Sequence, residues 1–112
     1  MAKKDRNVPG DAIALCAMEA ALATEGVASM AEAAISYDIS QLLTGTSKGI
    51  RVAQDREKIR VDVYLNALYG HKIPQIAWDV QENVKREVEE LTGRSVEAVN
   101  IHVQGVSFKD TE

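Results

Sequence analysis

The clearest pattern in the chain is an apolar stripe between residues 73 and 91. Apolar side chains recur there at intervals of three and four, which is the spacing of one helix face, and the opposite face is charged. Pro74 and Gly93 stand where such a helix would begin and end. The pattern predicts a long amphipathic helix. Its buried stripe should contain Ile73, Ile76, Ala77, Val80, Val84, Val88 and Leu91.

Alternation of apolar and polar residues predicts strands on both sides of this helix. Before it, Ile50 and Val52 share one face, and residues 59–66 alternate strictly. After it, residues 96–104 form a last strand. A period of two with one polar face indicates a sheet packed on one side only, with an antiparallel hairpin over 50–66. The polar face should carry Arg60, Asp62, Tyr64, Asn66, Asn100, His102 and Gln104.

The N-terminal half has weaker patterns. Pro9, Gly10 and Asp11 suit a helix start, and a stripe of small apolar residues indicates a helix over about 10–24. Residues 26–30 form a short candidate strand, and residues 31–43 fit either a short helix or a loop that covers the core. Residues 44–49, rich in Thr, Ser and Gly, predict a turn.

These elements predict an α+β fold, a two-layer sandwich. Its sheet should be mainly antiparallel, with three or four strands, and two or three helices should cover one face. We expect one domain over residues 9–106, with a flexible N-terminus at 1–8 and a flexible C-terminus at 107–112, because both ends are polar and lack periodicity.

Composition limits the functions to consider. Hydrophobic residues make up 46% of the 112, enough for a packed core, and the net charge of −4 disfavours a nucleic-acid partner. Cys16 is the only cysteine, so an internal disulfide is excluded and a reducing compartment, the cytoplasm, is expected. No apolar run approaches the roughly 18–20 residues that span a bilayer. We therefore expect no direct membrane insertion.

Candidate catalytic groups are few. His71 and His102 show no metal-ligand spacing, and Cys16 has no cationic neighbour in the sequence to activate it. Gly45 and Gly49 are one residue too far apart for the glycine clamp of K-homology domains. We expect no enzyme, no metal and no cofactor. The alternative is a module that binds a small ligand or, in a K-homology-like way, nucleic acid.

Several short segments follow one another in a specific order over residues 49–106, and Glu25-Gly26-Val27-Ala28-Ser29-Met30 precedes them. They include Gly49-Ile50-Arg51-Val52, Val61-Asp62-Val63-Tyr64-Leu65, Val80-Gln81-Glu82-Asn83-Val84-Lys85, Leu91-Thr92-Gly93 and Val99-Asn100-Ile101-His102-Val103-Gln104-Gly105-Val106. In this order the chain resembles the alkaline-shock-protein family of bacterial envelope stress response proteins. The resemblance implies a small cytosolic protein without catalytic residues that is linked to envelope homeostasis. It also implies a homo-oligomer and, in some members, recruitment to the membrane by an integral-membrane partner.

The resulting hypothesis is a non-enzymatic, self-associating scaffold or adaptor in the cell-envelope stress response. Two surfaces could carry the association: an unpaired sheet edge, with its row of backbone donors and acceptors, or the open sheet face. We favour the face, because tyrosine is a common interface anchor and because Arg60 and Asp62 could pair across a two-fold axis. The candidate interface residues are Arg60, Asp62, Tyr64, Asn100 and His102.

Overall fold

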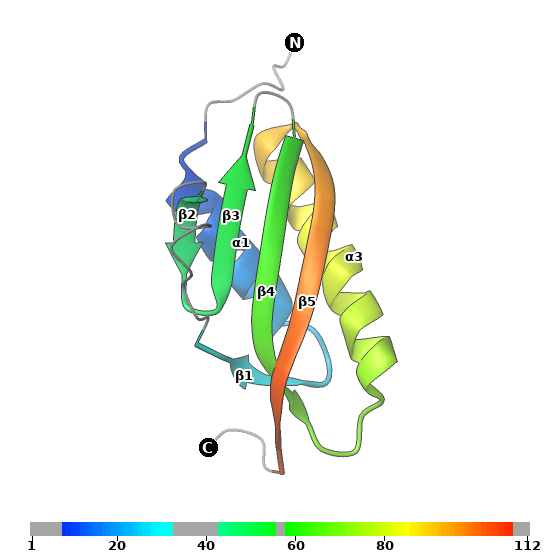
Figure 1. Cartoon of the computed structure of the whole chain (residues 1–112). Coiled ribbons are helices and arrows are strands. Elements are labelled where there is room, and N and C mark those ends of the chain that lie inside the picture. The colour runs from blue at the N-terminus through cyan, green and yellow to red at the C-terminus, as the bar shows by residue number, and fades with distance from the viewer. Residues whose placement is uncertain (1–7, 33–42, 56–57, 109–112) are drawn as a thin grey trace.

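A computed structural model describes residues 8–32, 43–55 and 58–108. Within them, two helices, α1 (Gly10–Leu22) and α3 (Ile73–Thr92), lie on the same face of one five-stranded sheet (Figure 1). This confirms the predicted α+β sandwich with helices on one side. The strands are β1 (Val27–Met30), β2 (Leu43–Ser47), β3 (Ile50–Gln54), β4 (Lys58–Leu68) and β5 (Ser95–Ser107).

Strand β4 is the centre of the sheet. It pairs with β3 and, further along, with β1, both antiparallel, and β3 pairs antiparallel with β2. β5 pairs with β4 in parallel along its whole length. The parallel pairing follows from the connection, since α3 carries the chain back over the helical face before β5 begins. The sheet is thus mainly antiparallel, as predicted, with one parallel edge strand.

Strand β2 corrects the prediction of a turn over residues 44–49 and raises the strand number from three or four to five. Only Lys48 and Gly49 form the turn between β2 and β3. The short polar side chains of this segment resemble a loop in composition, but the backbone of β2 packs directly on α1. A Cβ atom on Gly45 would lie 2.0 Å from the carbonyl carbon of Gly10. Glycine therefore permits a close approach that the pattern did not reveal.

The core lies between the two layers, and the predicted helix stripes form it. Ile13 and Ala17 of α1, and Val80 and Val84 of α3, are completely buried. The inward residues of β4, from Ile59 to Leu65, are equally inaccessible. The predicted stripe of α3 is wrong at its start, because Ile73 is 41% exposed and burial begins one turn later, at Ile76.

Several boundaries agree with the sequence pattern. Gly93 ends α3 in the left-handed conformation with φ 72°, and its N–H donates to Glu89 O at 2.8 Å. The candidate strand at 26–30 is β1. Most of the segment predicted as a helix or a loop, residues 33–42, lies outside the described residues, as do residues 1–7 and 109–112 of the predicted termini. β5 ends at Ser107, one residue beyond the expected domain boundary.

Candidate functional site

A stack of side chains occupies the middle of the sheet face opposite the helices. Tyr64 on β4 stacks on His102 of β5, with ring centroids 4.3 Å apart and ring planes within 9° of parallel. The guanidinium carbon of Arg51 on β3 lies 5.3 Å from the centre of the Tyr64 ring. Because β3 and β5 flank β4, the phenol ring stands between a cationic group and an imidazole.

Asp62 completes this cluster. The Nε2 atom of His102 and the Oδ1 atom of Asp62 are 3.1 Å apart, a hydrogen bond that becomes an ion pair when the imidazole is protonated. The parallel register makes this contact possible, since it places Asn100 beside Asp62 and His102 beside Tyr64. The His102 ring is therefore held by a stack on its face and by a carboxylate at its edge before any partner binds. About a third of each side chain remains exposed, 39% for His102 and 33% for Asp62.

The structure separates Arg60 from the cluster. Its Nε atom lies 3.4 Å from Oε1 of Glu97, and the two side chains are 57% and 42% exposed. Arg60 and Asp62, which were expected to pair across a two-fold axis, therefore each have a partner within the chain. Asn100 is exposed beside Asp62. Three of the five predicted interface residues thus form one cluster, and the other two lie next to it on the same face.

Sequence reasoning missed Arg51. Only 4% of its surface is exposed, although it lies on the sheet face opposite the helices. The alternation of this strand could have identified it. Ile50 and Val52 point into the core, so the residue between them points to the other face. Arg51 pairs in register with Asp62, and this pairing places it on the same face.

Side chains from the helices bond three backbone groups on the edge strands β5 and β2. On β5, the N–H of Val96 donates to Oε2 of Glu89 at 3.0 Å, and Gln81 Nε2 donates to Val99 O at 3.1 Å. On β2, the N–H of Thr46 donates to Oδ1 of Asp11 at 3.1 Å. Satisfied backbone groups offer little to an added strand. At these three positions an added strand would find no free backbone group, which argues for the open face over these parts of the edges.

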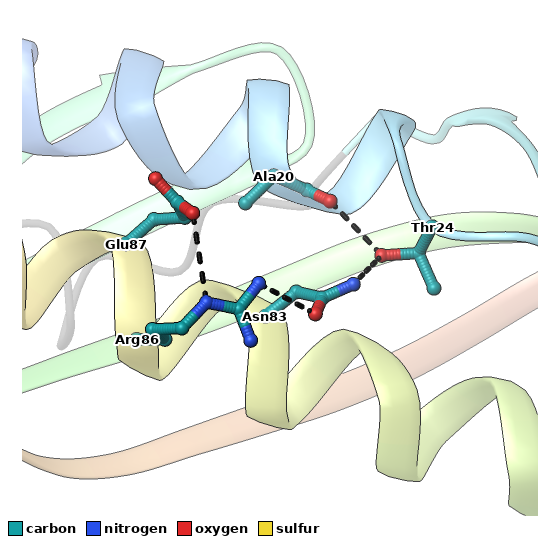
Figure 2. A network of polar contacts seen from close by, with 5 residues as sticks. All are labelled: Ala20, Thr24, Asn83, Arg86 and Glu87. Carbon is teal, nitrogen blue, oxygen red and sulfur yellow. Dashed lines mark hydrogen bonds and ion pairs between the residues drawn. The ribbon is translucent and has the colours of Figure 1, made fainter.

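A second feature lies on the opposite side of the molecule, between α1 and α3. Figure 2 shows a polar network that crosses from one helix to the other. Asn83 Nδ2 donates to Thr24 Oγ1 at 2.8 Å, and Thr24 Oγ1 donates to Ala20 O at 2.9 Å. Arg86 donates to Asn83 Oδ1 and lies 3.6 Å from Glu87 Oε2. The bond from Asn83 to Thr24 joins α3 to the segment that follows α1, so the network helps to hold the two helices together.

The same helices border an open groove of about 560 Å³ that includes Cys16. Burial raises the pKa of the Cys16 thiol, and the carboxylates of Glu87, Glu19 and Glu90 raise it further. A raised pKa keeps the thiol protonated at neutral pH, which opposes a nucleophilic role. Across residues 8–32, 43–55 and 58–108, no three His, Cys, Asp or Glu side chains gather where they could hold a metal ion.

Comparison with known proteins identifies the family. A family model described by a cell envelope-related function matches residues 2–108. The protein YloU of Bacillus subtilis (strain 168) is 36% identical over 103 residues, which cover 89% of this chain and 86% of YloU. The chain belongs to the alkaline-shock-protein family. This confirms the resemblance inferred from residues 49–106, and it gives the chain a cell envelope-related function at the level of the family.

Two further matches extend the comparison. Spy1614 of Streptococcus pyogenes serotype M6 is 36% identical to this alkaline-shock-family chain over 84 residues, covering 72% of the chain and 69% of Spy1614. Among solved structures, a MamM-CTD mutant has a TM-score of 0.52 at 17% identity, covering 90% of this chain and 91% of that one. At this identity the likeness shows the fold alone. None of the helices in the described residues is long and apolar enough to cross a membrane.

Proposed function

We propose that this alkaline-shock-family protein is a non-enzymatic adaptor in the cell-envelope stress response that associates with itself through the open face of its sheet. An integral-membrane protein would recruit the assembly to the envelope. The family's envelope-related function supports the setting. The observation that carries the proposal is the ordered cluster of Asp62, Tyr64 and His102 on the sheet face opposite the helices.

The cluster has the chemistry of an interface centre. Tyrosine buries a large apolar ring and keeps a hydroxyl for hydrogen bonding, and it is among the residues that dominate measured binding energies. Tyr64 is already stacked and His102 already hydrogen-bonded, so association would immobilise few additional side-chain torsions. Asn100 and Arg60 would form the polar rim around this centre.

Light scattering after size exclusion, over a range of protein concentrations, tests the proposal. We expect the mass of the wild-type protein to rise above that of one chain as concentration increases. Tyr64→Ala and Asn100→Arg should both return it to the mass of one chain, the first by removing the anchor and the second by placing a bulky charge at an exposed position beside it.

Tyr69→Ala is the matched control. Tyr69 is 64% exposed, lies beyond the end of β4 and stacks on Phe108 rather than on the cluster. Its loss should leave association unchanged. A wild-type protein that stays at the mass of one chain at every concentration would refute the proposal, and so would association that survives both Tyr64→Ala and Asn100→Arg.

A further inference from the structure

Arg51 is a buried cation whose hydrogen-bonding groups are incompletely used. Its Nε and Nη2 atoms are buried and make no hydrogen bond in the structure. No ion pair joins Arg51 to a carboxylate among the described residues, although Asp62 is its cross-strand neighbour. Asp62 is instead bonded to His102. A buried charge without an anionic partner is strongly unfavourable, so its retention at 4% exposure requires an explanation.

The two unused atoms are the informative ones. In a guanidinium group, the Nε–H bond and one N–H bond of Nη2 are parallel and form a fork that fits two oxygens attached to one atom. Carboxylates and phosphates present such oxygens. The Tyr64 ring lies against the guanidinium and supports its orientation from one side. The guanidinium of Arg51 thus has a fork of two unused N–H donors, and the described residues supply no anion for it.

We propose that Arg51 is the anchor of a binding site for the carboxylate or phosphate group of a small soluble ligand. The two oxygens of the anion accept from Nε–H and Nη2–H, and the anion neutralises the guanidinium. The fork lies below the molecular surface, so the side chain turns about its own torsions to admit the anion. This site goes beyond the proposed adaptor function, because it requires neither self-association nor a membrane partner.

Thermal unfolding with simple anions tests the proposal. The wild-type protein is melted in inorganic phosphate, in acetate and in chloride at equal ionic strength. We expect phosphate, acetate or both to raise the Tm above its value in chloride, increasingly with concentration, because a ligand that binds only the folded state stabilises it by mass action. The stronger of the two anions identifies the class of ligand.

Three variants make the test specific. Arg51→Met, which removes the charge but keeps a long side chain, should abolish the anion-dependent rise, and Arg51→Lys should lose most of it because an ammonium group has no fork. Arg60→Met is the matched control: it removes an arginine from the same sheet face that is exposed and paired with Glu97, and it should keep the full rise. In chloride alone, Arg51→Met should melt at or above the wild-type Tm, because a cation without a partner has been replaced by an apolar side chain.

The opposite results overturn the proposal. No rise in Tm with either anion would show that the fork binds no such ligand. An equal loss of the anion-dependent rise in Tm in Arg60→Met, or a full rise in Arg51→Lys, would contradict the proposal. Either result would show that the anions act by general charge attraction and not through the fork. An Arg51→Met protein that melts well below the wild type in chloride, or that does not fold, would show that the guanidinium has its partner within this same chain.

Discussion

Replacing Val84 with aspartate should prevent the domain from folding. Val84 is fully buried in the middle of α3, between Val80 and Val88, where the helix packs on the sheet. Val84→Ala alone removes two methyl groups, about 0.8 kcal/mol each in transfer free energy, and leaves a cavity. The free energy of unfolding should therefore fall by roughly 1.5–3 kcal/mol. Val84→Asp places a carboxylate at this fully buried position, which costs several kcal/mol more. The sum is comparable to the total stability of a small domain, about 5–15 kcal/mol.

Urea unfolding followed by circular dichroism measures both variants. Val84→Ala should lower the midpoint without changing the slope m, and Val84→Asp should show no cooperative transition. Lys85→Asp is the matched control, because it introduces the same residue one position further along the same helix, at an exposed site. The free energy of unfolding of Lys85→Asp should fall by no more than about 1 kcal/mol, mainly because aspartate has a low helix propensity. A Val84→Asp protein that unfolds cooperatively near the wild-type midpoint would refute the assignment of this stripe to the core.

Two further predictions test close packing and thiol chemistry. Gly45→Ala should lower the free energy of unfolding by about 1–3 kcal/mol or more in the same urea assay, because its Cβ would meet backbone atoms of Gly10 and Asp11. Gly105→Ala is the control: its Cβ would meet only the end of the Asn66 side chain, so the free energy of unfolding should fall clearly less. Equal losses in the two variants would contradict the close contact between β2 and α1. Iodoacetamide should alkylate Cys16 more slowly in the folded than in the urea-unfolded protein at pH 8, since burial and nearby carboxylates raise the pKa of the folded thiol, and equal rates would contradict this. Because the folded thiol keeps its proton to higher pH than the unfolded one, its contribution to the free energy of unfolding should also fall as the pH rises through the ordinary thiol pKa and above.

The sequence predicted the parts of the fold that depend on local periodicity. The stripe of α3 and the alternation of β4 each bury one face, and burial follows directly from such spacing. β2 was missed because its role rests on a contact with a distant segment: Gly45 lies against Gly10, and Ser47 Oγ donates to Ala14 O at 3.2 Å. Neither contact produces a periodic pattern in the sequence of a five-residue strand.

The candidate site, too, could be predicted only in part from the sequence. Alternation was sufficient to place Asp62, Tyr64 and His102 on one face. The residues before and after each of them in its strand are apolar and point to the other face. The stack of Tyr64 on His102 depends on the parallel register of β4 with β5, and strand order is not encoded in either strand alone. The burial of Arg51 was also unpredictable, because an arginine between two apolar residues in a strand ordinarily faces solvent.

The distance between spin labels on two associated chains tests most directly whether the open sheet face is the interface. In a Cys16→Ala background, one label replaces Ser29, an exposed residue that accepts a hydrogen bond from Asn66 on the open face, and in a second sample it replaces Lys85 on the exposed side of α3. The molecule measures 23 Å along its shortest axis. Two copies joined by their sheet faces would therefore hold the Lys85 labels about twice that distance apart and the Ser29 labels much closer. Pulsed electron paramagnetic resonance should give the shorter distance for Ser29; a shorter distance for Lys85, or no dipolar coupling at either site, would contradict self-association through the open face.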